Sequence, residues 1–377
     1  MRLRSISALY AVIVAISGTI LLAGCATGHK QFAYVVGQGT NEVFAFREQG
    51  NGTLTPLGAP NFPAGSAPVA MTPHTSGAFL YVVSFAGNTV TLLDINKGNG
   101  ELSTPVTNSV VTPVNPPNIF STGAGPVAVA MSPTAPFLYV ANQSAGTISG
   151  YNVDPGQGTL GNLQGSPFPV TTPAVSNPSA LVISPNGKFL FVANGTQGTI
   201  AAFGIGADGG LTAIGAPVAL STGATPNSLA LEHSGRFLYA ADPAHNAVFG
   251  LAIQGNGSLT AITGSPFPAG TQPSAVAADP QGAFLFAANT GSNNVSAYVI
   301  DANSGALGQV TGSPFPTGGQ GPSGLAVDAN TTVLYVTEQT THDIAALAIS
   351  SNATLKPISG SPFAVATSAT AITLVQR

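Results

Sequence analysis

The sequence predicts an all-β fold, a seven-bladed β-propeller closed by the C-terminal strand of the chain. A FLYVAN-like segment recurs seven times, and its copies begin at Phe32, Phe79, Phe137, Phe189, Phe237, Phe284 and Val333. Successive copies lie 47 to 58 residues apart, close to the length of four short antiparallel strands and their turns. β-Branched and aromatic runs bounded by Gly, Pro and Asn fill each unit, as expected of strands.

Each unit contains four expected strands. In the sixth unit they are PSAVAAD from Pro273, FLFAAN from Phe284, NVSAYVI from Asn294, and a segment from Leu307 into the GSPFP motif at Gly312. We number them first to fourth. Because neighbouring strands are antiparallel, the 1–2 and 3–4 turns share one face of the ring, and the 2–3 and 4–1 loops share the other.

The two ends of the chain indicate how the ring closes. The first unit begins directly at a second strand, at Phe32, whereas the chain ends in SATAITLVQR, a copy of a first strand. We therefore expect a strand from about Thr370 to Val375 to complete the first blade. The propeller would span residues 32–377, and its closure leaves no free sheet edge at the seam.

The N-terminus is typical of an exported lipoprotein. Residues 1–24 have Arg2 and Arg4 followed by an apolar run, as in a signal peptide. The sequence Leu22-Ala23-Gly24-Cys25 resembles a bacterial lipobox and contains the only cysteine. The resemblance implies a membrane anchor on lipidated Cys25, a tether over residues 25–31, and a place in the cell envelope, at the outer membrane or the cell surface. We expect the 1–2 face to lie toward the membrane.

Composition excludes several functions. Charged residues are 6% of the chain, with 9 Lys and Arg against 13 Asp and Glu, so no basic stripe is present to bind nucleic acid. A single cysteine allows no disulfide within the chain. Tryptophan is absent, which removes the usual stacking platform for a quinone cofactor or a sugar, and no cofactor is predicted.

The residues that end the second strands form a ring by repeat equivalence. Asn is the ordinary member, because its side chain starts turns. Glu338 differs, and a carboxylate at the mouth of an apolar pocket would be the candidate general base, although a solvated loop carboxylate is the alternative. The full ring is Gly37, Ser84, Asn142, Asn194, Asp242, Asn289 and Glu338.

Further candidates lie in the 2–3 loops. The predicted binding residues are Asp242, His245, His342, Asp343 and Glu42, together with Asn142, Asn194 and Asn289. Because blades seven and one are neighbours in the ring, Glu338, His342, Asp343 and Glu42 could converge. A metal needs three or four convergent ligands, and we predict none.

The FLYVAN segments, aromatic third strands, GxL turns and GSPFP motifs resemble the lactonase-type propellers, which include bacterial 6-phosphogluconolactonase and the muconate-cyclising enzymes. The resemblance covers residues 31–377 and implies the seven-bladed fold. Family enzymes often carry Gly-Pro-Arg-His where a first strand begins. Here the two residues after each Pro are uncharged, namely Val69-Ala70, Val127-Ala128, Ser179-Ala180, Asn227-Ser228, Ser274-Ala275 and Ser323-Gly324. A phosphorylated lactone needs cationic donors, so the sequence argues against 6-phosphogluconolactone.

Three functions remain open at this point. The leading interpretation is a lipid-anchored binding or interaction module for an unknown protein or glycan on the outward face. The alternatives are a divergent lactone hydrolase and a surface adhesion or structural protein. A long insertion after Leu102, rich in Val, Pro and Asn, lies toward the outward face and is a candidate contact for a partner.

Overall fold

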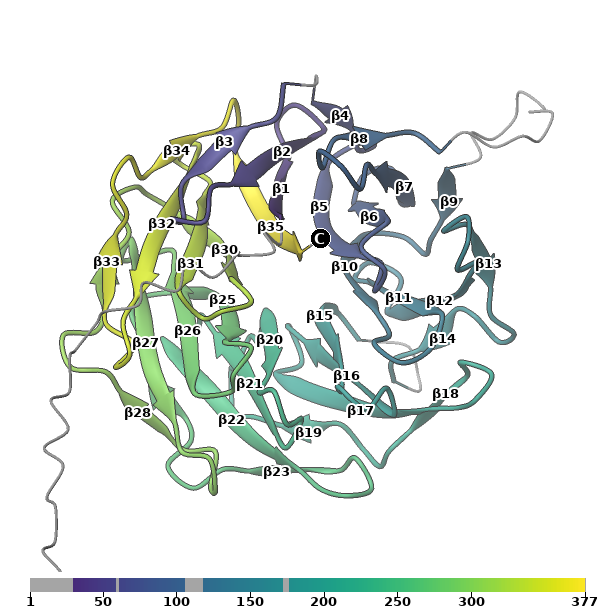
Figure 1. Cartoon of the computed structure of the whole chain (residues 1–377). Coiled ribbons are helices and arrows are strands. Elements are labelled where there is room, and N and C mark those ends of the chain that lie inside the picture. The colour runs from purple at the N-terminus through teal and green to yellow at the C-terminus, as the bar shows by residue number, and fades with distance from the viewer. Residues whose placement is uncertain (1–29, 59–60, 106–117, 172–175, 377) are drawn as a thin grey trace, which may run out of the picture.

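The computed structural model describes residues 30–58, 61–105, 118–171 and 176–376, and these form seven five-stranded sheets around a central axis (Figure 1). The all-β, seven-bladed prediction is confirmed. The described residues contain no helix long and apolar enough to cross a membrane. The signal peptide, Cys25 and all but the last residues of the tether lie outside the described residues, as does most of the insertion after Leu102, so those statements stay predictions.

Each sheet is built outward from the axis in the same order. The first, innermost strands are β35 (Ala369–Gln376), β5 (Pro68–Pro73), β10 (Pro126–Met131), β15 (Pro178–Ile183), β20 (Ser228–Leu231), β25 (Pro273–Ala278) and β30 (Pro322–Val327). The second strands are β1 (Gln31–Gly37), β6 (Phe79–Ser84), β11 (Phe137–Asn142), β16 (Phe189–Asn194), β21 (Phe237–Asp242), β26 (Phe284–Asn289) and β31 (Val333–Glu338). The third strands are β2 (Glu42–Glu48), β7 (Thr89–Ile95), β12 (Thr147–Val153), β17 (Thr199–Ile205), β22 (Ala247–Ile253), β27 (Asn294–Ile300) and β32 (Asp343–Ile349).

The expected fourth strand is two short strands rather than one. The fourth strands proper are β3 (Leu54–Pro56), β8 (Leu102–Ser103), β13 (Leu160–Asn162), β18 (Leu211–Ala213), β23 (Leu259–Ala261), β28 (Leu307–Gln309) and β33 (Leu355–Pro357). The fifth strands, which pair with the other end of each third strand, are β4 (Phe62–Pro63), β9 (Ile119–Ser121), β14 (Phe168–Pro169), β19 (Val218–Ala219), β24 (Phe267–Pro268), β29 (Phe315–Pro316) and β34 (Phe363–Ala364).

All seven blades have the split, and in blades three, five, six and seven it lies at a Gly-Ser-Pro-Phe sequence, the start of the GSPFP motif. Its proline removes a backbone N–H donor, and the preceding serine takes over the contact with the third strand. Ser265 Oγ accepts the Gly250 N–H at 2.9 Å, and Ser313 Oγ accepts the Ala297 N–H at 2.9 Å. The motif therefore bends the chain away from the third strand while keeping the N–H groups of that strand paired.

The second strands are buried on both sides. Alternate residues of a strand point to opposite faces, so Tyr139 and Ala141 pack toward blade four, while Leu138 and Val140 pack toward blade two. Both sets are fully buried. This is why FLYVAN is a continuous apolar run and does not alternate with polar residues.

Tyrosines in the second strands hold neighbouring blades together. The hydroxyl of each one donates to the carbonyl of a glycine in the 3–4 turn of the next blade, at 2.7 to 3.0 Å. The pairs are Tyr34 with Gly100, Tyr81 with Gly158, Tyr139 with Gly209, Tyr239 with Gly305 and Tyr335 with Gly52. Phe191 and Phe286 occupy the same place in blades four and six.

The seam closes as the sequence predicts. Strand β35 pairs antiparallel with β1, with Phe32 opposite Val375 and Val36 opposite Ala371, and it lies beside β1 in Figure 1. Tyr335 adds a hydrogen bond to Gly52 across 283 residues of sequence. The ends of the propeller domain are thus joined by a strand pair and by a side-chain bond.

We expect Tyr335→Phe to lower the free energy of unfolding by about 1–3 kcal/mol, because the buried Gly52 carbonyl loses its donor. Urea unfolding monitored by circular dichroism measures the change. Phe286 occupies the equivalent position in blade six, so a phenylalanine ring fits there. The loss of unfolding free energy therefore reports the missing hydroxyl group alone. An unfolding free energy equal to that of the wild type would contradict the importance of this bond.

Candidate functional site

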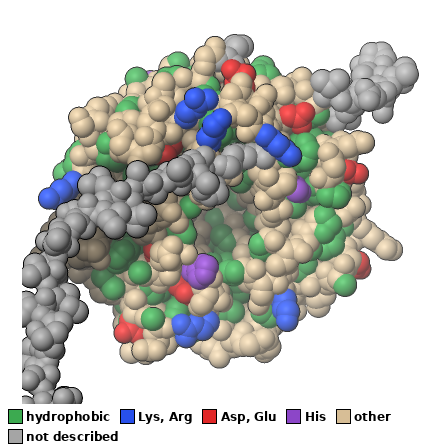
Figure 2. Space-filling model, in the orientation of Figure 1, with side chains coloured by type: hydrophobic (Ala, Val, Ile, Leu, Met, Phe, Trp, Pro, Cys, Tyr) green, Lys and Arg blue, Asp and Glu red, His purple; other side chains and the backbone are tan. Residues whose placement is uncertain are grey.

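The two faces of the ring differ in charge. Every Lys and Arg that the structure describes lies in, or beside, a 1–2 or 3–4 turn, namely Lys30, Arg47, Lys97, Lys188, Arg236 and Lys356. Figure 2 views the ring from this side and shows these cations around a hollowed centre. The opposite face carries Glu42, Asp242, Glu338, Asp343, His245 and His342 in its 2–3 loops. Among the described residues, that face has carboxylates and imidazoles but no Lys or Arg.

The ring of second-strand ends anchors loops. Asn142, Asn194 and Asn289 are fully buried. Asn142 Nδ2 donates to Ser149 Oγ at 2.9 Å, and Ser149 Oγ in turn accepts the Gly123 N–H of the 4–1 loop at 3.1 Å. Asn289 is linked to its 4–1 loop through Ser296 in the same way. Asn194 Nδ2 donates to Thr199 Oγ1 of its own third strand at 3.1 Å. A part for these three residues in ligand binding stays a prediction.

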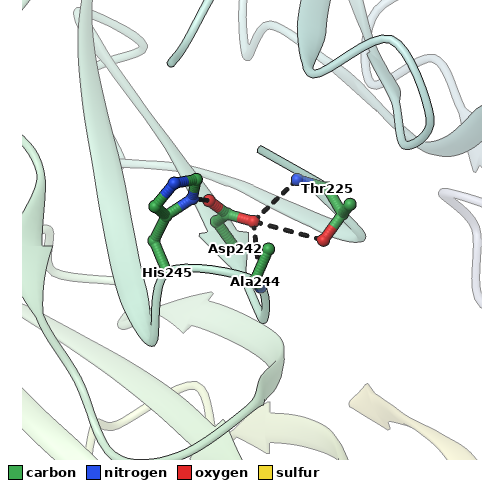
Figure 3. A network of polar contacts seen from close by, with 4 residues as sticks. All are labelled: Thr225, Asp242, Ala244 and His245. Carbon is green, nitrogen blue, oxygen red and sulfur yellow. Dashed lines mark hydrogen bonds and ion pairs between the residues drawn. The ribbon is translucent and has the colours of Figure 1, made fainter. Parts of the chain in front are cut away.

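Asp242 and His245 form a hydrogen-bonded dyad in blade five (Figure 3). Asp242 is fully buried, and its Oδ1 accepts the N–H groups of Thr225 at 2.7 Å and Ala244 at 3.2 Å. Its Oδ2 lies 2.5 Å from His245 Nδ1. The imidazole packs edge-on against Phe249, with ring centroids 6.3 Å apart. A carboxylate held in this way fixes the orientation of the imidazole ring.

The other nitrogen of the imidazole is available for chemistry. The His245 side chain is 37% exposed, and its Nε2 has no hydrogen bond to any described residue. An imidazole whose Nδ1–H is held by a carboxylate presents a basic Nε2. Sequence reasoning included both residues as separate binding candidates and did not pair them. The i, i+3 spacing of Asp and His within one turn was the signal available in the sequence.

Glu338 lies in a second buried cluster, in blade seven. It is fully buried and accepts hydrogen bonds from the Thr317 hydroxyl and from the Gly319 N–H, the latter at 3.1 Å. Asp343 faces it directly across the β31–β32 hairpin. Burial, and then the neighbouring carboxyl group of Asp343, raise the pKa of Glu338 to about 8. At neutral pH this carboxyl group therefore keeps its proton, and its Oε2 is buried without a hydrogen-bond partner among the described residues.

Of the four residues that could converge, the structure pairs Glu338 with Asp343. Both belong to blade seven. Glu42 accepts a hydrogen bond from Asn61 within its own blade at 3.3 Å. His342 is exposed and has a φ of 61°, at the turn position where Asn41, Asn88, Asn246 and Asn293 also have positive φ. No group of three or more His, Cys, Asp or Glu side chains in the described parts of the chain is arranged to hold a metal ion. No hydrogen bond or ion pair joins Glu42 to blade seven in the described residues, so a convergence of Glu42 with that blade stays a prediction.

An uncharged cavity of about 280 Å³ lies on the axis. Its walls are the beginnings of first strands from six blades, and all of the lining residues are small, polar but neutral, or aliphatic. Three serines on its rim donate to a backbone carbonyl of the following blade, namely Ser179 to Pro226 (2.6 Å), Ser274 to Pro322 (2.9 Å) and Ser323 to Ala369 (3.0 Å). The position that carries Arg in the Gly-Pro-Arg-His stretch thus faces this cavity, and it is neutral here.

The dyad and the cavity lie on the same face of the ring and are connected through residues 225–227. Asp242 accepts the Thr225 N–H, and Asn227, two residues further along the chain, lines the cavity. Two residues of extended chain span about 7 Å. An imidazole base and a neutral pocket therefore lie on the same side of the ring, at blade five.

These features define a closed seven-bladed propeller with an axial pocket, and the family model "Lactonase, 7-bladed beta-propeller" matches residues 25–173, 168–264, 217–321 and 253–368. The chain belongs to this lactonase family. No curated protein sequence matches it.

Several solved structures share the fold. A candidate 6-phosphogluconolactonase from Bacteroides uniformis has a TM-score of 0.77 at 21% identity, covering 92% of this chain and 99% of its own. A second candidate 6-phosphogluconolactonase, from Bacteroides fragilis, has a TM-score of 0.74 at 21% identity, covering 93% and 99%. The periplasmic gluconolactonase PpgL of Pseudomonas aeruginosa has a TM-score of 0.74 at 21% identity, covering 92% and 99%.

We expect Glu338→Gln to make stability less dependent on pH. The folded state raises the pKa of Glu338 from 4.5 to about 8, so folding takes up a proton and stability falls as the pH rises between these values. Glutamine mimics the protonated carboxyl group and stays neutral at any pH.

Melting temperatures at pH 5 and pH 9 test this expectation. The wild type should lose stability relative to Glu338→Gln at pH 9, and the two should be close at pH 5. Glu42→Gln, on the same face but outside the pair, is the matched control. Parallel curves for the wild type and Glu338→Gln would show that the pair does not share a proton.

Proposed function

We propose that this protein is a lactone hydrolase that acts on uncharged lactones at the 2–3 face of the ring. Membership of the lactonase family supports the reaction class. The observation that carries the proposal is the Asp242–His245 dyad beside a neutral axial cavity. Together they offer a base, and a pocket close to the size of one sugar ring.

His245 would supply the proton transfers. Its Nε2 removes a proton from a water molecule as the water oxygen attacks the lactone carbonyl carbon. The tetrahedral intermediate then collapses, the ring C–O bond breaks, and the protonated imidazole returns its proton to the leaving alkoxide. The product is a hydroxy acid. Asp242 holds the ring and stabilises the imidazolium form, and such acid–base catalysis contributes about 10²- to 10⁴-fold in rate.

The charge of the site favours a neutral substrate. The described part of the 2–3 face has four carboxyl-bearing side chains and no Lys or Arg, and no lining residue of the cavity is charged. A phosphate group needs Arg or Lys donors to replace its hydration. A phosphorylated lactone would therefore bind poorly.

The proposed reaction departs from the interpretation that leads at the sequence level. Family membership supports hydrolysis over a binding module, whereas no described feature favours adhesion. We retain the lipid anchor at Cys25 and the place in the cell envelope as part of the proposal. On this view the catalytic face points away from the membrane, since the chain enters the ring from the opposite face.

Base uptake in a pH-stat tests the function directly. We expect the purified protein to hydrolyse D-glucono-δ-lactone above the buffer rate, and His245→Gln to lower kcat by about 10²- to 10⁴-fold with little change in KM. His342→Gln, the same change on an exposed histidine of the same face, should keep full activity.

Glu338→Gln separates the two candidate bases. If His245 is the base, Glu338→Gln keeps most of the activity, because the buried carboxyl group is already protonated. Loss of activity in Glu338→Gln with full activity in His245→Gln would transfer the role to Glu338. Hydrolysis no faster than buffer in the wild type, with this lactone and its relatives, would sink the proposal.

A cation on the rim should change the substrate preference. Val127 lines the cavity. Because its side chain is aliphatic, replacing it removes no hydrogen bond. We expect Val127→Arg to lower KM for the 6-phosphorylated lactone at least tenfold, since the guanidinium provides the missing phosphate donor. Val127→Gln, similar in length but uncharged, should not. Equal effects of the two substitutions would contradict the role assigned to charge.

A further inference from the structure

A polar groove of about 220 Å³ lies between blades one and two, on the face opposite the proposed catalytic site. Blade one contributes Arg47 and Gln49 to it, and blade two contributes Asn99 and Glu101 from its 3–4 turn. The groove shares no lining residue with the axial cavity. It is therefore a separate place on the molecule.

The guanidinium of Arg47 is unusual in having no hydrogen-bond partner. Its Nε is buried without a partner. The side chain makes no hydrogen bond or ion pair with any described residue. Its Cζ lies over the Phe32 ring, 5.9 Å from the ring centroid. A guanidinium carries five N–H donors, and leaving such a group partly buried and unpaired is costly. The two Nη groups of Arg47 are not among the buried unpaired atoms, and Arg47 lines the groove, so an anion there would supply acceptors to these terminal groups.

Arg236 shows the contrast on the same face. It also lies over an aromatic ring, that of Phe237, at 5.0 Å. Its Nε donates to Ser234 Oγ at 3.0 Å, and its Nη2 donates to the Ala302 carbonyl at 2.5 Å. The protein thus satisfies one arginine internally and leaves the other directed at a groove.

Two lysines lie at the 3–4 turn of blade two that contributes Asn99 and Glu101 to the groove. Lys30 Nζ donates to the Gly98 carbonyl of the 3–4 turn that forms the groove wall, at 2.8 Å, and Lys97 is the neighbour of Gly98 in that turn. Figure 2 shows Lys and Arg side chains close together on this face. Glu101 lines the same groove, but no ion pair joins it to Arg47 in the described structure.

We propose that this groove binds a phosphate ester group. Arg47 would grip two phosphate oxygens with its planar fork, and Lys30 and Lys97 would add charge without fixed geometry. The ester belongs either to a membrane phospholipid or to a soluble molecule. The site adjoins the start of the tether, and the predicted lipidation site Cys25 is five residues before Lys30, at most about 18 Å of extended chain.

Thermal shift and calorimetry on the full chain purified in detergent test the site with two probes. These are sn-glycerol 3-phosphate and dihexanoyl-phosphatidylglycerol below its micelle concentration. We expect binding that raises the melting temperature and that is weakened at least tenfold in Arg47→Gln. Arg236→Gln, the same substitution on the internally bonded arginine, should bind within about twofold of the wild type.

Arg47→Gln removes no hydrogen bond, so it should fold with a melting temperature near that of the ligand-free wild type. Tighter binding of the lipid assigns the site to a membrane headgroup, and tighter binding of glycerol phosphate assigns it to a soluble ester; both support the site. Failure of both probes to bind, or equal weakening in Arg47→Gln and Arg236→Gln, would overturn it. Lactone hydrolysis is measured separately, so either proposal fails independently of the other.

Discussion

The hydrogen bond from a second-strand tyrosine to the 3–4 turn of the next blade is the interaction on which the ring depends. It is repeated at five of the seven junctions, and the Tyr335–Gly52 bond crosses the seam. Each blade has two apolar faces that can be buried only against its neighbours. The buried hydroxyl of each tyrosine needs a hydrogen-bond acceptor. Because that acceptor is a glycine carbonyl in the next blade, the bond fixes the distance between the two neighbouring blades. At the other two junctions Phe191 and Phe286 occupy the same place, so burial of the apolar faces closes the ring, and the tyrosines fix that distance at the five junctions that have them.

Closure also separates the chemistry of the two faces. The 2–3 and 4–1 loops meet at one end of the axis. There, most second strands end in a residue whose buried side chain makes hydrogen bonds that hold a 4–1 loop. Two blades depart from this pattern. In blade five the anchor is Asp242, which uses one oxygen for the loop and the other for His245. In blade seven the anchor is Glu338, which accepts from its loop and faces Asp343. Both departures place ionisable groups where the other blades have neutral ones.

The fold could be predicted from sequence because the repeat is strict. The spacing of FLYVAN segments, the missing first strand at the start and the extra copy at the end specify seven blades and their closure. The sequence did not reveal that the outer strand is divided in every blade, or that in four blades a serine hydroxyl replaces a backbone acceptor at the division. The candidate site was predicted less well. Residue type identified Asp242, His245 and Glu338, but only burial and distance show that His245 has a free nitrogen and that Glu338 is enclosed. The unpaired state of Arg47 depends on contacts between two blades, which no local pattern records.

The central claim is that a neutral cyclic ester binds on the axis beside His245. A crystal structure of the protein with D-glucono-δ-lactam, a stable uncharged analogue, tests it most directly. The account predicts the lactam ring within the axial cavity, with its carbonyl carbon within reach of His245 Nε2 through one water molecule, about 5–6 Å. Density for the lactam in another place, or on the axis but directed away from blade five, would contradict the account.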